Sequence, residues 1–233
     1  KLFELIDVND LASLAKIIDG NLTGENKRFQ YITTDSRRIN RDTLFLALLG
    51  EKYDGNDFCE TAIEAGAQAY ISTKEIINKT GIVVEDTYLA LLKMARYQQQ
   101  QVNPKTLAIT GSNGKTTLKE MVAHILDEQE SIKTKDNENN QFGIPFTVLR
   151  LKPETRFLVL ECGARKLGDF DLISEYLKFD VLAITNINNS HIEIFENQTN
   201  IIRTKTKLLD GLRVGGSFID GAFEDWGTSD KLL

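Results

Sequence analysis

The chain has 233 residues, of which 41% are apolar and 27% charged, and its 28 basic and 34 acidic side chains leave a formal net charge of −6. This composition is typical of a folded globular protein of one large or two small domains, and it excludes a disordered chain. This net negative charge does not favour binding to duplex nucleic acid or to an anionic membrane. No apolar run approaches the roughly 18 residues of a membrane span, and two cysteines, Cys59 and Cys162, are too few for a disulfide framework. We therefore expect a cytoplasmic protein that binds neither nucleic acid nor membrane.

The first hundred residues have the pattern of a small α/β domain. A helix is predicted over residues 11–18, where Asn9 or Asp10 can cap its start and Gly20 can end it. Two short strands, a turn, a second helix and a third strand follow at residues 31–34, 44–48, 54–55, 58–65 and 69–72. A longer helix is predicted over residues 87–101. Pro104 and the two residues before it break that helix, so we place a domain boundary between residues 103 and 104.

Beyond residue 104, strands and helices alternate. Three continuously apolar runs, at residues 107–110, 157–160 and 181–185, are typical of strands buried on both faces of a parallel sheet. The clearest helix between them is predicted over residues 115–128. Its apolar stripe consists of Leu118, Met121, Val122, Ile125 and Leu126. The alternation predicts an α/β fold in which a doubly wound, mostly parallel sheet follows the smaller first domain.

A glycine-rich loop joins the first of these strands to the strong helix. Its residues are Gly111, Ser112, Asn113, Gly114, Lys115, Thr116 and Thr117. Glycines let the backbone wrap around an oxyanion, and the free amides at a helix start favour negative charge. Lys115 adds a charge for the β- and γ-phosphates, and the Thr116 hydroxyl is placed to reach a phosphate-bound Mg²⁺. The alternative is a glycine-rich turn with an incidental lysine, but strand, loop and helix all stand where nucleotide binding requires them, so we predict a P-loop.

Polar side chains follow the other two apolar runs. Glu161 comes directly after the second run, and Asn186 and then His191 follow the third. Ligands of open α/β sheets bind beyond the carboxyl ends of the strands, so we expect Glu161 and His191 near the phosphate loop, where a carboxylate is a natural Mg²⁺ ligand. A helix cap or surface acid is the alternative for Glu161, and histidine is a less typical partner of Mg²⁺. The other histidine, His124, lies off the apolar stripe and is expected in solvent.

The helix predicted over residues 197–212 carries a lysine on its apolar stripe. Lys205 fills the gap between two apolar pairs, Ile201-Ile202 and Leu208-Leu209. In one interpretation its ammonium group extends to water. In the other it reaches an enclosed polar site, where burial favours loss of its proton and chemical modification. The pattern allows both.

These motifs together resemble those of the Mur ligases of peptidoglycan synthesis. The matching segments cover nearly the whole chain, at residues 34–58, 62–71, 110–120, 137–145, 161–164 and 185–195 and in the Lys205 helix. The resemblance implies ATP-dependent phosphorylation of a peptide carboxylate, giving an acyl phosphate that an amine then attacks. The Lys119-Glu120 pair, residues 139–145 and residues 191–193 favour the member that joins D-alanyl-D-alanine to UDP-N-acetylmuramoyl-tripeptide.

The resemblance also implies roles for individual residues. It places the ATP phosphates on residues 111–117, with Lys115 at the γ-phosphate and Thr116 on one Mg²⁺. Glu161 and His191 resemble the ligands of a second Mg²⁺, and Lys205 resembles a lysine that carries a carbamate formed with CO₂. Asn139 and Asn140 match the segment that lines the phosphates. The UDP-sugar is expected at Asp35, Ser36, Arg37, Asp54 and Gly55.

Two other interpretations remain open. A sister ligase that adds a diamino acid to a muramoyl dipeptide, or glutamate to folate, would share the chemistry and differ in substrate. A fragment could also bind nucleotide or UDP-sugar without turnover. Mur ligases carry a third domain, and this chain is about half the size expected for three. We therefore expect a monomer with a UDP-sugar domain at residues 1–103, part of an ATP-binding domain at residues 104–233, and no C-terminal ligase domain.

Overall fold

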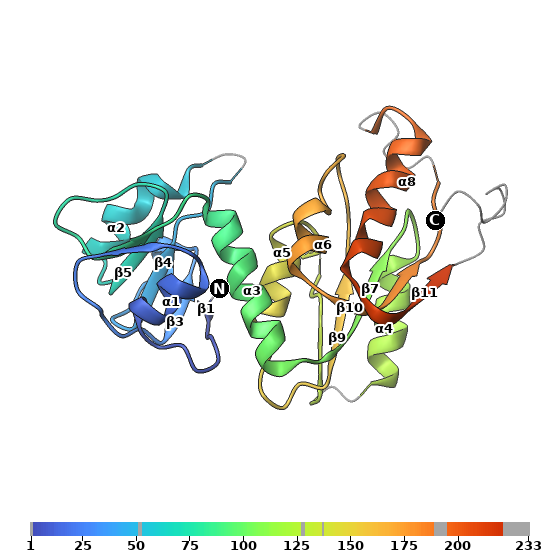
Figure 1. Ribbon diagram of the computed structural model, residues 1–233, viewed down its shortest axis with the longest axis horizontal. Helices are drawn as coiled ribbons and strands as arrows, with labels where there is room; N and C mark the ends of the chain where they lie inside the picture. Colours follow the sequence, from blue (N-terminus) through green and yellow to red (C-terminus); the bar gives the residue numbers. More distant parts are fainter. Residues whose placement is uncertain (1, 51–52, 127–128, 137, 189–194, 221–233) are drawn as a thin grey trace. The chain divides into compact units, whose positions relative to one another are not determined.

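The computed structural model describes residues 2–50, 53–126, 129–136, 138–188 and 195–220 (Figure 1). The chain forms two compact units: unit 1 comprises Lys1–Gln101 with Val148–Pro153, and unit 2 comprises Val102–Thr147 with Glu154–Leu233. Unit 1 thus takes in a short segment from far along the chain, which the sequence pattern did not indicate. Among the described residues, none of the helices has the length and apolar character needed to cross a membrane.

Unit 1 is built on a mixed six-stranded sheet of order β1-β3-β4-β5-β6-β2. Its strands are β1 (Leu2–Phe3), β2 (Asn21–Thr23), β3 (Tyr31–Thr33), β4 (Thr43–Leu46), β5 (Ala69–Ser72) and β6 (Gly81–Val83). Strands β3 to β6 run parallel, and the outer strands β1 and β2 are antiparallel to their neighbours. The helices are α1 (Leu11–Ile17), α2 (Cys59–Glu64) and α3 (Thr87–Val102), with 3₁₀ turns η1 (Ser36–Arg38) and η2 (Gly55–Phe58).

Helix α1 begins as predicted and ends differently. The Asp10 side chain caps the helix by accepting a hydrogen bond from the Ser13 backbone N–H at 3.0 Å. The left-handed residue after the helix is Asp19, with φ of 53°, rather than Gly20. Gly20 serves close packing instead, because a Cβ there would lie 2.4 Å from Cγ2 of Ile82.

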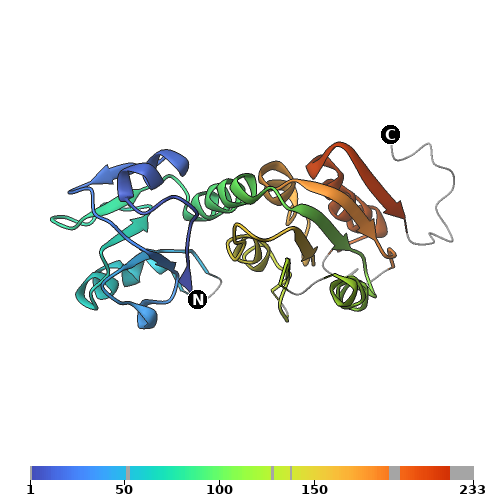
Figure 2. The ribbon, with the colours of Figure 1, turned by 90° about the horizontal axis from the view of Figure 1, so that it is seen from below.

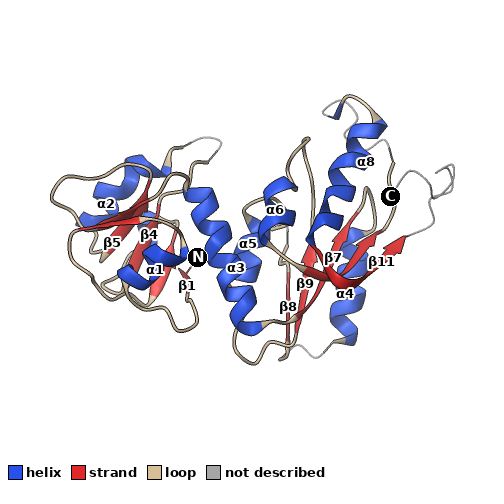
Figure 3. Cartoon of the chain, viewed as in Figure 1, coloured by secondary structure: helices blue, strands red, loops and turns tan. Residues whose placement is uncertain are grey.

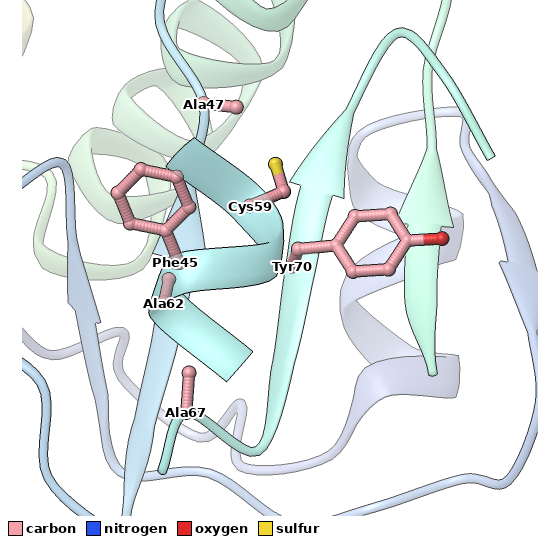
Figure 4. Packing of buried hydrophobic residues seen from close by; sticks show 6 residues of the cluster. All are labelled: Phe45, Ala47, Cys59, Ala62, Ala67 and Tyr70. Atoms are coloured by element: carbon pink, nitrogen blue, oxygen red, sulfur yellow. The ribbon is translucent and has the colours of Figure 1, made fainter. Parts of the chain in front are cut away.

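A cluster of buried apolar side chains joins α2 to the sheet (Figure 4). Phe45 comes from β4 and Tyr70 from β5, and Cys59 and Ala62 come from α2. Burial raises the pKa of the Cys59 thiol to about 11, so this cysteine behaves as a small apolar residue. The Tyr70 ring extends towards β6, and its hydroxyl accepts a hydrogen bond from the Ile76 backbone N–H at 2.8 Å.

Unit 2 is built on a five-stranded sheet of order β11-β10-β7-β9-β8, in which every pair is parallel. Its strands are β7 (Lys105–Thr110), β8 (Ser131–Lys133), β9 (Phe157–Glu161), β10 (Phe179–Ile184) and β11 (Leu212–Asp220). The helices are α4 (Lys115–Ile125), α5 (Gly143–Val148), α6 (Asp171–Tyr176) and α8 (Gln198–Thr206), with the 3₁₀ turn η3 (Lys207–Gly211). Strands and helices alternate (Figure 3), and the arrows of β7, β10 and β11 point the same way (Figure 2). The predicted α/β fold class is confirmed.

The predicted apolar stripe of α4 is only partly correct. Leu118, Val122 and Leu126 pack against the sheet residues Ile109, Val159 and Ala183. Met121 and Ile125 are 60% and 82% exposed, and the residues of α4 that are fully buried are Lys119 and Ala123. The helix is therefore rotated so that a lysine, rather than Met121, faces the interior.

The helix predicted over residues 197–212 is shorter than expected. Helix α8 ends at Thr206, and the chain continues as η3 and then enters β11 at Leu212. Ile201 and Leu208 are buried as the apolar pattern suggested, and Lys205 is buried with them, but the three residues lie on two elements. Gly211 permits the change of direction, because a Cβ there would lie 2.5 Å from the Phe179 ring.

Replacing Gly81 with Ala is expected to destabilise unit 1. A Cβ at position 81 would lie 2.3 Å from Cζ of Tyr70, whose side chain is fully buried and cannot withdraw. Overpacking of this kind costs about 1–3 kcal/mol in the free energy of unfolding, which urea titration followed by circular dichroism measures. Gly50→Ala is the matched control, because the nearest atom to a Cβ there is 3.4 Å away. Equal unfolding free energies for the two variants would contradict this prediction.

Candidate functional site

The central strand β7 brings the ends of three strands to one edge of the unit 2 sheet. It lies between β10 and β9, and the register pairs Thr110 with Ile184 and Ile109 with Glu161. The loop after β7, Glu161 at the end of β9 and Asn186 after β10 are therefore neighbours. The sequence-based juxtaposition of the phosphate loop with Glu161 agrees with this register.

The loop between β7 and α4 adopts a conformation that requires glycine. Gly111 and Gly114 have φ values of 139° and 79°, in the region that side chains rarely adopt. A Cβ at Gly111 would lie 2.0 Å from Oγ1 of Thr185. The chain after β10 holds the loop, because the Asn113 backbone N–H donates to Oδ1 of Asn186 at 2.9 Å. The loop is thus held against the segment that follows β10.

Glu161 is a buried carboxylate with an asymmetric set of neighbours. Its residue is 1% exposed. Its Oε1 accepts hydrogen bonds from the Thr116 hydroxyl at 3.0 Å and from Nδ2 of Asn139 at 2.9 Å. Its Oε2 lies 3.3 Å from Nζ of Lys119 but accepts no hydrogen bond. Glu161 therefore has two hydrogen bonds at one oxygen and only an ion pair at the other, so it can still bind a further cation.

The oxygens around Glu161 fit a hard cation such as Mg²⁺. A carboxylate and a hydroxyl meet there, at Oε1 of Glu161 and the side chain of Thr116, directly after the phosphate loop. Within the described ranges no three His, Cys, Asp or Glu side chains gather into a metal site. Mg²⁺ does not require one, because it commonly takes one or two protein carboxylates and completes its shell with water and phosphate. His191, the other predicted ligand, lies outside the described residues.

Two lysines converge on one backbone carbonyl of the loop. Nζ of Lys115 donates to the carbonyl oxygens of Gly111 at 2.8 Å and Ser112 at 3.1 Å, and Nζ of Lys205 donates to Gly111 at 3.0 Å. Burial lowers the pKa of the Lys115 ammonium. Burial, together with the charge of Lys115, lowers the pKa of Lys205 to about 8. Lys205 is 6% exposed, so its side chain reaches an enclosed polar site rather than water.

The remaining predicted residues of unit 2 have local roles in the structure. Oδ1 of Asn140 accepts hydrogen bonds from the backbone N–H groups of Phe142 and Gly143, so Asn140 stabilises the turn into α5. Asn139, in contrast, contacts Glu161. His124 is exposed, as predicted. Lys119 was noted in the sequence only for the family resemblance. Its spacing of three residues from Thr116, on the same helix face, is the signal that could have placed it near the loop.

The predicted UDP-sugar residues lie in unit 1, on segments that follow the parallel strands β3 and β4. Asp35 caps η1 and accepts a hydrogen bond from Nε of Arg37 at 2.8 Å, which lowers the pKa of Asp35 to about 2. The Arg37 side chain itself is 87% exposed. Asp54 caps η2 by accepting a hydrogen bond from the Asn56 backbone N–H at 2.9 Å, next to Gly55.

Comparison with known sequences gives the same family for both parts of the chain. Residues 28–112 match the Mur ligase family catalytic domain, and residues 109–227 match the Mur ligase middle domain. The UDP-N-acetylmuramoyl-tripeptide–D-alanyl-D-alanine ligase of Haemophilus influenzae is 36% identical over 90% of this chain and 48% of its own length. The enzyme of the same name from Bacillus subtilis is 35% identical over 91% of this chain and 48% of its own length. The chain thus spans about half the length of the curated relatives it matches.

Solved structures agree with the sequence comparison. MurF from Acinetobacter baumannii superposes with a TM-score of 0.83 and 30% identity, covering 94% of this chain and 49% of that one. MurF ligase from Thermotoga maritima in complex with ADP superposes with a TM-score of 0.75 and 28% identity, covering 81% of this chain and 45% of that one.

The Lys205 side chain is expected to lose its proton with a midpoint at about pH 8, because it is buried beside a second cation. The Cε resonance of Lys205 in ¹³C-lysine-labelled protein reports this midpoint, and its absence from Lys205→Met assigns the signal. Lys115→Met is expected to raise the midpoint, because it removes the neighbouring charge. A midpoint near the about 10.4 of a free lysine side chain would contradict this description.

Proposed function

The chain belongs to the Mur ligase family, and we propose that it forms the UDP-sugar-binding and ATP-binding parts of a ligase that joins D-alanyl-D-alanine to UDP-N-acetylmuramoyl-tripeptide. The observation that carries the proposal is the contact between the Thr116 hydroxyl and the buried Glu161 carboxylate, directly after a phosphate-binding loop. Two relatives that carry this enzyme's name are 36% and 35% identical, which supports the choice of substrate. The activity belongs to the complete protein, of which this chain matches about half.

The loop of residues 111–117 is proposed to hold the ATP phosphates. Its backbone amides stand at the start of α4, where the helix dipole favours negative charge. Lys115 now donates to two loop carbonyls, and a γ-phosphate would give its ammonium a charged acceptor in their place. The solved relative in complex with ADP supports the assignment of the nucleotide.

Thr116 is proposed to hold one Mg²⁺ next to the phosphates, and Glu161 and His191 are proposed as ligands of a second. Bound Mg²⁺ neutralises the negative charge that develops on a transferring phosphoryl group. The residues of this chain orient the acceptors: Asn139 and Thr116 fix Oε1 of Glu161, and Asn186 fixes the loop. Catalysis is then mainly a matter of position and electrostatics.

Lys205 is proposed to carry a carbamate. With a pKa of about 8, a substantial fraction of its amine is neutral near physiological pH. The neutral nitrogen can attack the carbon of CO₂, forming an N–C bond and releasing a proton. The product is an anion in place of a cation, which relieves the repulsion between Lys205 and Lys115 and adds a carboxylate-like group to the metal site.

Unit 1 is proposed to bind the UDP-sugar through Asp35, Ser36 and Arg37 and through the turn at Asp54 and Gly55. The exposed Arg37 guanidinium, held by Asp35, suits an anionic diphosphate. ATP would phosphorylate the terminal carboxylate of the peptide, and the amine of D-alanyl-D-alanine would attack the acyl phosphate and displace phosphate. We infer that the protein works as a monomer in the cytoplasm.

The substrate assignment predicts a clear preference in a phosphate-release assay with the complete gene product that contains this chain. With UDP-N-acetylmuramoyl-tripeptide and ATP, D-alanyl-D-alanine is expected to support turnover, while glutamate and diamino acids are not. Lys115→Met is expected to lose at least about a hundredfold in kcat, because it removes a charge at the phosphoryl group. Lys105→Met is the control, since its exposed ammonium pairs with Asp180.

Turnover of a muramoyl dipeptide with a diamino acid, or of folate with glutamate, would assign the chain to a sister ligase. Near-normal turnover by Lys115→Met would contradict the assignment of the phosphate loop.

A further inference from the structure

Lys119 is a charged side chain buried inside unit 2. It is 1% exposed and is among the largest fully buried side chains of the described residues. Its Nζ lies 3.3 Å from Oε2 of Glu161 and 3.2 Å from Oε1 of Glu120. Glu120, which is half exposed, also pairs with Lys133 at the end of β8. A row of alternating charges therefore leads from the surface at Lys133 to the interior at Glu161.

Stability alone does not account for a lysine at this position. Burying an ammonium and a carboxylate is costly, and replacing such a pair by packed apolar residues is often neutral or stabilising. The neighbouring positions Leu118 and Val122 show that α4 packs apolar side chains against the same sheet. The Lys119–Glu161 pair is therefore better explained by the proposed role of Glu161 as a metal ligand than by the packing of α4.

The two oxygens of Glu161 face different surroundings. Oε1 contacts Thr116, which is exposed at the loop, and Asn139, which is partly buried. Oε2 contacts the fully buried Lys119. Thr116 and Lys119 stand one turn apart on α4, so a single helix contacts the carboxylate from its outer and inner sides. This arrangement fixes the plane of the carboxylate relative to the phosphate loop.

We propose that Lys119 is a positioning residue for the metal site: its ammonium group holds Oε2 of Glu161 and so orients the carboxylate toward the Mg²⁺ that accompanies ATP. This inference rests on the proposed function, because it needs a metal-nucleotide complex at the loop. Residues that orient metal ligands commonly change metal affinity by about 10- to 100-fold when they are removed. A competing idea is that the ammonium occupies the cation's own place. Lys119 is fully buried and contacts Oε2, whereas exposed Thr116 contacts Oε1, and this argues against that idea.

The test measures ATP binding to the complete gene product that contains this chain by calorimetry, once with Mg²⁺ and once with EDTA. The ratio of the two affinities is the metal enhancement, and thermal unfolding is recorded for each variant. Lys119→Met removes the ammonium and keeps the length of the side chain, and Lys119→Arg keeps the charge in a different shape. Lys133→Met is the matched control, because Lys133 contacts Glu120 rather than Glu161.

Metal enhancement is expected to fall about tenfold or more in Lys119→Met and several-fold in Lys119→Arg, while binding in EDTA and the Lys133→Met control stay near wild type. Equal losses with and without Mg²⁺, accompanied by a lower melting temperature, would assign Lys119 a structural role and overturn the proposal. Stronger Mg²⁺-dependent binding in Lys119→Met would show that the ammonium occupies the cation's place, which also overturns it.

If Lys119→Met does not fold, the metal enhancement of Lys119→Arg tests the proposal. Wild-type enhancement in Lys119→Arg would show that charge balance alone is needed, and the proposal would fail. If the complete wild-type protein binds ATP in neither condition, the proposed function itself is refuted, so the two failures are distinguishable.

Discussion

The burial of the Glu161 carboxylate is the constraint on which the rest of unit 2 depends. An ionised group with 1% exposure must be compensated within the protein. Thr116 and Lys119 from α4 and Asn139 from the segment before α5 supply that compensation. These contacts tie the helix after the phosphate loop, the Asn139 segment and the end of β9 into one arrangement. Together with the apolar contacts of Leu118 and Val122 on the sheet, they hold α4, and with it the end of the loop, beside Glu161.

The site also separates charge in a way that suits a metal-nucleotide complex. On the loop side, Lys115 and Lys205 both donate to the Gly111 carbonyl, and this crowding of cations lowers the pKa of Lys205 to about 8. On the other side stands the Glu161 carboxylate with an oxygen that accepts no hydrogen bond. In the proposed complex, phosphate oxygens would bind on the first side, and a divalent cation would bind beside Thr116 and Glu161 on the second. An electrostatically unsatisfied site of this kind is a common feature of functional centres.

Much of this arrangement could be predicted from the sequence, because buried parallel strands produce continuous apolar runs. Those runs located β7, β9 and β10, and strand order then brought Glu161 to the loop. Lys119 could not be placed in the interior by the same reasoning, since apolar periodicity assigns a charged residue to the solvent face. The two-residue strand β1 is too short to show a period, and the turn from η3 into β11 depends on the close approach of Gly211 to Phe179. Sequence patterns therefore predict the sheet better than the ion pairs within it.

The most direct test of the account is a crystal structure of the chain with Mn²⁺ and a non-hydrolysable ATP analogue. Anomalous scattering locates Mn²⁺ independently of the protein atoms. The account predicts phosphates on the backbone amides of the loop, Lys115 turned from Gly111 to the γ-phosphate, and a manganese peak in contact with Thr116 or Glu161. Phosphates bound elsewhere, or a loop-bound nucleotide whose manganese touches neither residue, would contradict it.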